Sequence, residues 1–269
     1  MHSGAKKDRC RWFGRFLVLG LCTCSHGAVA QGTNDLQSAI LTFRKASDDW
    51  SGEELLQATD GFASLLKQDP TSPLLQYWHG VASVHCCLHQ QGNADTVDKK
   101  QRSRNLKRAH DSLTRLLKLD PENGEAHAMM ATLTGLQIAA RPWTGIARGP
   151  SADRSTKRAL ALGMENPRVH YLIGSNCFHG PSMLGGWEQA REHFEEAERL
   201  YQKELESNRD EWAPGWGYSS CLFFLARILE EEGRNEEAIA YLERAQRINP
   251  ADERVQRSLQ RLSAQGGGT

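Results

Sequence analysis

The stretch of residues 233–250 constrains the fold more than any other part of the chain. Gly233 can end one helix, Glu236 and Glu237 suit the positive N-terminal end of the next helix, and Pro250 stops that helix. Ala238, Leu242 and Ala245 recur between these signals at helical spacing. The two alanines let a neighbouring helix approach closely, and the apolar run at 218–232 supplies that neighbour. The pattern therefore predicts two helices joined by a short turn.

Related units are expected earlier in the chain, because a single helical hairpin cannot bury its apolar face alone. The same offsets before a proline recur twice, in Ala58, Phe62 and Leu65 before Pro70 and in Ala109, Leu113 and Leu116 before Pro121. Weaker matches to this pattern precede Pro167 and occur at residues 190–197. The four marker prolines at 70, 121, 167 and 250 are separated by 51, 46 and 83 residues, so long loops interrupt the repeats.

Apolar periodicity and helix breakers together predict five helical hairpins and a C-terminal capping helix. The expected helices cover 34–48 and 51–68, 73–91 and 100–119, 123–140 and 151–164, 167–179 and 186–206, 214–232 and 235–248, and 251–263. The last segment carries few apolar residues among many charges, which is typical of a terminal helix with one wet face.

Residues 233–250 resemble the second half of a tetratricopeptide repeat, and residues 166–174 and 180–187 are similar to a segment of exported bacterial proteins of this kind. The resemblance implies an all-α fold, a right-handed superhelix of stacked helical hairpins. It also implies that a groove binds a protein or peptide partner, and it implies no reaction.

In that family the first helix of each pair lines the concave groove. This register places six aromatic and arginine side chains there: Tyr77, Trp78, Arg168, Tyr171, Phe223 and Arg227. Such side chains bury a large area at low entropic cost and often dominate binding energy. They are the predicted partner-binding residues.

The N-terminus has the order of an export signal. Five basic residues precede the apolar segment 16–22, and Ala28-Val29-Ala30 offers small residues at the positions that a signal peptidase reads. The apolar run is too short to anchor the chain in a bilayer. We therefore predict a signal peptide at 1–30, a repeat domain at 31–265, a flexible tail at 266–269, and a periplasmic or secreted product.

The charge balance argues against nucleic acid as a partner. The full chain has 33 basic and 33 acidic residues, and removing residues 1–30 leaves 28 and 32, a net charge near −4. Nucleic-acid binding favours a basic domain instead. No second long apolar segment follows, so no stable membrane anchor is expected after signal removal. The sequence does not fix the oligomeric state.

A metal site in the bacterial envelope is the alternative function. His85 and His89 stand one helical turn apart in His-Cys-Cys-Leu-His, a spacing that can chelate a metal ion, and Cys177 and His179 can add soft ligands for copper or zinc. Neither CxxC nor HExxH occurs, however. The primary interpretation therefore has no cofactor.

Four cysteines remain after signal removal, at positions 86, 87, 177 and 221. If Gly80, Gly174 and Ala226 occupy equivalent positions, Cys177 and Cys221 are offset by about eight residues, or about 12 Å. Disulfides require about 7 Å or less between α-carbons. Free thiols are therefore favoured, with one bridge as the alternative if the long loops shift the helices.

The sequence offers no catalytic motif. It lacks a GxSxG elbow, a P-loop and a dinucleotide fingerprint, and its acidic pairs and clusters are typical of charged helix ends. The chain is therefore predicted to be a non-catalytic binding scaffold.

The first prediction concerns processing. Cleavage between Ala30 and Gln31 is expected on export, because the small residues follow the apolar run at the required distance. The intact mass of the exported protein checks it, and a mass that retains residues 1–30 contradicts it.

Overall fold

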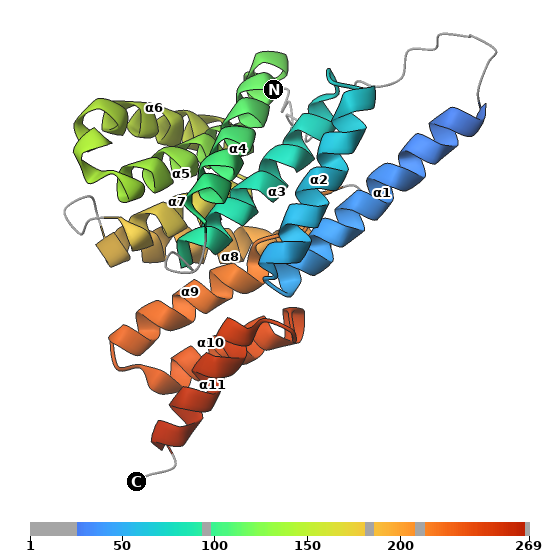
Figure 1. The fold of residues 1–269 in the computed structure, drawn as a ribbon. Helices are drawn as coiled ribbons and strands as arrows, with labels where there is room; N and C mark the ends of the chain where they lie inside the picture. Colours follow the sequence, from blue (N-terminus) through green and yellow to red (C-terminus); the bar gives the residue numbers. More distant parts are fainter. Residues whose placement is uncertain (1–25, 93–97, 181–185, 208–212, 267–269) are drawn as a thin grey trace, which may run out of the picture.

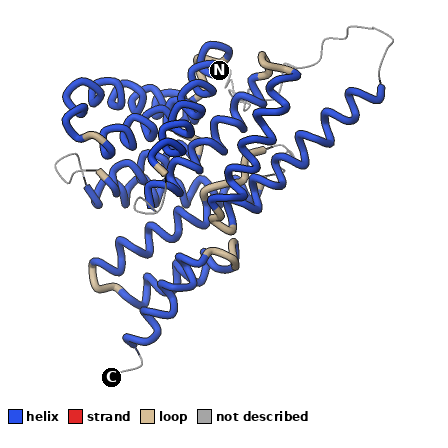
Figure 2. The backbone as a smooth tube through the Cα atoms, viewed as in Figure 1, coloured by secondary structure: helices blue, strands red, loops and turns tan. Residues whose placement is uncertain are grey.

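The computed structural model describes residues 26–92, 98–180, 186–207 and 213–266, and these form eleven α-helices and one 3-10 turn without a strand (Figure 2). The helices are α1 His26–Asp48, α2 Gly52–Gln68, α3 Pro73–Gly92, α4 Lys99–Leu119, α5 Gly124–Ala140, α6 Gly145–Gly163, α7 Pro167–His179, α8 Gly186–Glu206, α9 Tyr218–Glu231, α10 Asn235–Ile248 and α11 Glu253–Gly266. The 3-10 turn is η1, Pro142–Thr144. Residues 1–25 of the predicted signal and 267–269 of the predicted tail lie outside the described residues.

The helices stack as hairpins, as the sequence predicts (Figure 1). Each odd-numbered helix from α1 to α9 packs along the helix that follows it, and α11 covers α10. Successive hairpins touch through α2 and α3, α4 and α5, and α8 and α9. Among the described helices, none is long and apolar enough to cross a membrane.

Two helix starts differ from the prediction by more than four residues. The helix α1 begins at His26, inside the predicted signal. The helix α6 begins at Gly145 and continues through Pro150, whereas the expected helix began after that proline, at residue 151. A proline there removes one main-chain hydrogen bond. The packing of α6 along α5, which buries Ala159 and Gly163, overrides that local preference.

One turn recurs at three of the four marker prolines. Asp69, Asp120 and Asn249 end α2, α4 and α10 by donating their main-chain N–H to the carbonyl four residues earlier, at 3.1, 2.7 and 2.9 Å. A proline follows each and prevents the helix from continuing. Side-chain oxygens two residues beyond that proline accept main-chain N–H groups of the next helix, at Ser72, Asn123 and Asp252. Pro167 is different, because it is the first residue of α7 and Asn166 caps that helix.

Small residues let the paired helices approach closely. A Cβ atom added to Gly80 would lie 2.8 Å from the side chain of Leu113, and one added to Gly174 would lie 2.9 Å from the ring of Phe194. Ala226 is buried on α9. Gly80 and Gly174 therefore occupy close-packing positions, as the comparison of the repeats assumed.

The core has two parts. One runs through the first four hairpins into α9, and a smaller cluster joins α9, α10 and α11. Val255 and Leu262 of α11 are buried in the smaller cluster, while the exposed residues of that helix include Arg257 and Arg261. The helix α11 thus caps the stack as predicted.

Substituting two glycines should separate close packing from helix propensity. Gly174→Ala should lower the free energy of unfolding by about 1–3 kcal/mol, because the new methyl group meets a buried ring and the Ala190 carbonyl oxygen at 3.2 Å. Gly135→Ala on α5 meets nothing within 4 Å, and should raise stability by up to about 1 kcal/mol through helix propensity. Urea unfolding of the two variants measures both changes. An equal stabilisation by both would show that α7 and α8 do not pack as described.

Candidate functional site

The predicted groove residues lie in two different environments. Tyr77 and Trp78 on α3 and Arg168 and Tyr171 on α7 are buried. These four side chains belong to the interior of this conformation, and their placement on an open groove is corrected here. Phe223 and Arg227 on α9 stay partly exposed.

The segment 213–217 between α8 and α9 contacts three of these side chains, those of Tyr77, Arg168 and Tyr171. Trp78 is instead packed between the rings of Phe43 and Phe62.

Side chains from three helices donate hydrogen bonds to the main-chain carbonyls of the segment 213–217: Arg44 to Ala213 at 3.1 Å, Arg168 to Pro214 at 3.0 Å, and Tyr201 to Trp216 at 3.0 Å. Gly217 ends the segment with a φ of 102°, a left-handed conformation that favours glycine. We call this stretch the inner segment. It packs against the face formed by α1, α3, α7 and α8, which we call the inner face.

Trp216 anchors the inner segment. Its indole N–H donates to the Tyr77 hydroxyl at 3.3 Å, and its ring meets the edges of His85 and Tyr171 at centroid distances of 5.1 and 6.2 Å. The side chain is almost fully buried. A large aromatic group with a satisfied N–H is a strong anchor, because it removes much apolar area from water without leaving a donor unpaired.

A buried ion-pair network lies beneath the inner segment. The Arg168 guanidinium donates to Glu125 at 2.7 Å and to Glu204 at 2.9 Å, so one cation joins α5, α7 and α8. Glu125 also accepts the Tyr77 hydroxyl at 2.5 Å and the Asn166 amide at 2.7 Å. Burial acts to lower the pKa of Arg168, but the attraction of these carboxylates outweighs it and raises the pKa. The arginine is therefore held as a cation.

An aromatic row, which we call the rim, joins the end of α7, the start of α8 and the helix α9. Trp187 stacks on Phe178 at 5.3 Å between centroids, and Phe178 and the edge of His179 pack on Phe224 at 5.1 and 5.4 Å. Phe223 adjoins Phe224 at 5.6 Å. Trp187 and His179 are exposed, while Phe178 and Phe223 are partly exposed. Accessible rings in a continuous row are a typical protein-binding surface.

Arg227 extends the aromatic row along α9, one helical turn after Phe223. Its side chain keeps 36% of its area exposed and lies 3.5 Å from Glu230 and 3.7 Å from Glu231. Such exposed pairs contribute little to stability, so a partner can compete for this guanidinium.

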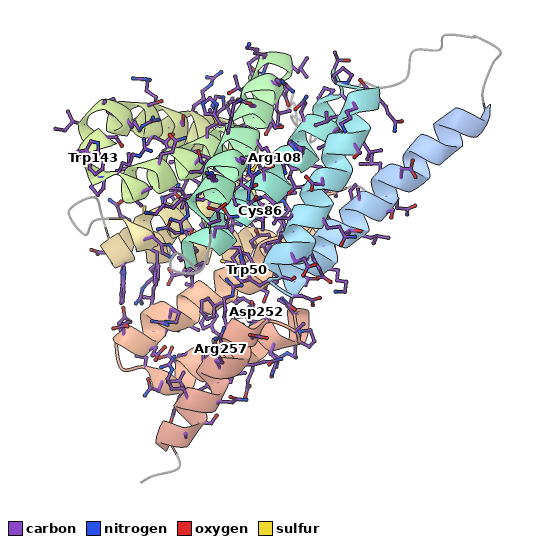
Figure 3. All side chains as sticks on the ribbon, in the orientation of Figure 1. Trp50, Cys86, Arg108, Trp143, Asp252 and Arg257 are labelled. Carbon is purple, nitrogen blue, oxygen red and sulfur yellow. The ribbon has the colours of Figure 1, made fainter. Side chains whose placement is uncertain are left out.

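A second contact, which we call the terminal clasp, joins the first hairpin to the last (Figure 3). The Asn249 amide donates to the Asp48 carbonyl at 2.6 Å. Arg254 lies between two rings, 4.4 Å from the Trp50 centroid and 5.2 Å from that of Phe223. Trp50 has a φ of 49°, a strained conformation for a bulky residue. The clasp holds it in the α1–α2 turn.

The proposed metal ligands serve other roles. Burial lowers the pKa of His85 to about 4, so the ring is neutral, and its Nδ1–H donates to the Val81 carbonyl at 2.9 Å. His89 packs against Trp50. Cys177 and His179 sit at the end of α7, where the histidine bonds to the Ser175 carbonyl. Among the described residues, no group of three or more suitable side chains could hold a metal ion.

The four cysteines of the repeat domain are free thiols. Burial raises the pKa of Cys86 to about 11, and it raises the pKa of Cys87, Cys177 and Cys221 as well. Thiolates are the reactive form, so these thiols are poor nucleophiles.

The sequence analysis did not identify Arg44 and Tyr201, which bind the inner segment, or Glu125 and Glu204, which bind Arg168. Two signals were available. Glu125 opens an otherwise apolar helix, and Pro214-Gly215-Trp216-Gly217 interrupts the helical pattern next to a tryptophan. Neither signal says which distant side chains meet.

Comparison with known proteins supports the fold. The tetratricopeptide repeat family model matches residues 219–252. The structure of the HusA haemophore from Porphyromonas gingivalis is similar, with 16% identity, a TM-score of 0.59, and coverage of 77% of this chain and 96% of that one. TTC0263, a thermophilic TPR protein in Thermus thermophilus, aligns with 15% identity and a TM-score of 0.57 over 87% of this chain and 99% of its own. No curated protein matches the sequence. At these identities the likeness shows the fold alone.

The Asp48 side chain should make stability depend on pH. Partial desolvation, with the neighbouring Asp49 carboxylate, raises the pKa of Asp48 to about 6 against the opposing attraction of Arg44. A folded-state pKa above that of the unfolded chain favours the protonated group. The contribution of the protonated Asp48 carboxyl to stability is therefore complete below about pH 4 and is lost as the pH rises through about 6.

Asp48→Asn should abolish this loss, which we expect to be about 1 kcal/mol after allowance for solvent screening. Urea unfolding between pH 4 and pH 7 compares the variant with the wild type, and Asp35→Asn, an exposed carboxylate on the same helix, is the control. A stability difference between wild type and Asp48→Asn that stays constant over this range contradicts the prediction.

Proposed function

We propose that this tetratricopeptide repeat protein is a non-catalytic scaffold that binds a protein or peptide in the bacterial cell envelope. The proposal rests on the contacts that the inner face makes with the inner segment. Three side chains from three helices hold a non-helical stretch of chain by its carbonyls, and the rings of His85 and Tyr171 pack on its tryptophan. This is the chemistry by which a scaffold recognises an extended peptide.

The partner engages the rim, since the inner segment already fills the centre. The aromatic row of Trp187, Phe178, His179 and Phe223, extended by Arg227, offers accessible rings and a guanidinium whose ion pairs are weak. Aromatic and arginine side chains supply most hot spots in protein interfaces. The two groove residues that remain accessible belong to this surface.

The absence of a reaction is part of the proposal. The perturbed groups of the interior have packing causes: burial holds His85 neutral and keeps Cys86 and Cys87 as thiols. Catalytic groups instead need a pKa matched to their task and access to a substrate.

The envelope location rests on the N-terminal pattern of basic residues, apolar segment and small residues. Fractionation of cells that produce the full chain tests it, and retention in the cytoplasm would contradict it.

Partner binding should depend on the rim. A photo-crosslinking residue at Phe223 should capture the envelope partner, whereas the same residue at Leu119, an exposed apolar side chain at the end of α4, should not. Arg227→Ala should weaken the captured complex by about 1–2 kcal/mol with an unchanged melting curve, because the side chain is partly exposed. Equal crosslinking at both positions would contradict the rim assignment, and no crosslink at Phe223 would contradict the proposed function.

A further inference from the structure

The turn from α5 to α6 exposes two large apolar side chains at the edge of the molecule. Trp143 is 76% exposed and Ile146 is 93% exposed. Figure 3 shows Trp143 at the outer edge of the hairpin, directed away from the rest of the stack. We call these two side chains the tip. Exposed apolar groups of this size next to each other mark an interaction surface.

Basic side chains surround the tip. Arg141 and Arg148 flank it, and residues 141–158 carry five basic side chains and one acidic one, in a chain whose formal net charge is zero. The acidic residue, Asp153, pairs with Lys157 at 2.8 Å. The net charge of the residues around the tip is therefore positive.

Helical spacing continues the basic surface along α6. Arg154, Lys157 and Arg158 follow Ile146 by 8, 11 and 12 residues, so the four side chains fall within an arc of about 120° around the helix, and all are exposed. No ion pair involves Arg154 or Arg158 within the described part of the chain. We call these three residues the basic face.

The shape and chemistry fit a lipid surface better than a protein. The tip protrudes, so a rigid protein would need a matching pocket, whereas a bilayer interface deforms around an inserted side chain. Tryptophan is enriched at membrane interfaces because its ring is apolar and its N–H is polar. Lysine and arginine beside an inserted apolar group add attraction to anionic headgroups.

We propose that the α5–α6 edge binds the surface of an anionic phospholipid membrane, with Trp143 and Ile146 in the headgroup region and the basic face against lipid phosphates. The attachment is peripheral, and the helix lies on the membrane without crossing it. This surface is separate from the aromatic row, so the proposal stands independently of the partner bound at the rim.

Vesicle binding tests the proposal with the mature full chain. Co-sedimentation should show strong binding to vesicles that mix phosphatidylcholine with phosphatidylglycerol, and at least about tenfold weaker binding to phosphatidylcholine alone. Arg154→Gln combined with Arg158→Gln should weaken binding to the anionic vesicles at least about tenfold, while the double change to lysine should preserve it. Trp143→Ala should weaken it about tenfold at any salt concentration, because insertion is apolar.

Matched variants elsewhere on the surface serve as controls. Leu119→Ala removes an exposed apolar side chain from α4, and Arg257→Gln removes an exposed positive charge from α11 (Figure 3). Both should bind anionic vesicles like the wild type, and every variant should keep the wild-type melting curve.

Three results would overturn the proposal: no binding to anionic vesicles, equal loss in the control variants, or unchanged vesicle binding by the tip and basic-face variants. If those variants keep vesicle binding but lose a crosslinked protein, the edge is a protein interface. Failure of rim crosslinking would leave the vesicle results unaffected, so the two proposals fail separately.

Discussion

The buried charge of Arg168 is the constraint on which the interior depends. A guanidinium taken out of water is costly unless carboxylates and hydrogen bonds replace the lost hydration, and Glu125, Glu204 and the Pro214 carbonyl do so from three different elements. Removing one partner would leave an uncompensated charge, at a cost of about 3–5 kcal/mol. The ion pairs therefore fix how α5, α7, α8 and the inner segment sit together.

This arrangement turns an open array into one with a filled inner face. In a simple repeat array each hairpin touches only its neighbours. Here the inner segment contacts α1, α3, α7 and α8, and the terminal clasp adds a bond between the Asp48 and Asn249 regions. The first and last hairpins are thereby coupled directly. The strained Trp50 turn persists because Arg254 and the neighbouring rings hold it from outside.

In the two proposals, recognition takes place at the edges of the molecule, because the inner segment fills the centre. The aromatic row with Arg227 and the tip with its basic face lie on different hairpins and differ in chemistry. The row joins rings that are partly supported from below by Phe224, which suits a structured partner. The tip has two protruding side chains and surrounding cations, which suits a soft anionic surface. A scaffold with both can hold a protein partner close to a membrane.

The sequence by itself determined the helices, their pairing and the cap, because the signals for these features act within a few residues. The Asp-Pro turns end α2 and α4, and Gly80 and Gly174 admit a neighbouring helix that follows closely along the chain. The sequence named six groove residues as one set and did not separate Phe223 and Arg227, which stay partly exposed, from the other four. Only the tertiary structure decided that Tyr77, Trp78, Arg168 and Tyr171 are interior. Trp78 is covered by Phe43 and Phe62 of the first hairpin, and the other three contact the inner segment. That segment also binds Arg44, 169 positions away along the chain, and no local pattern encodes such a meeting.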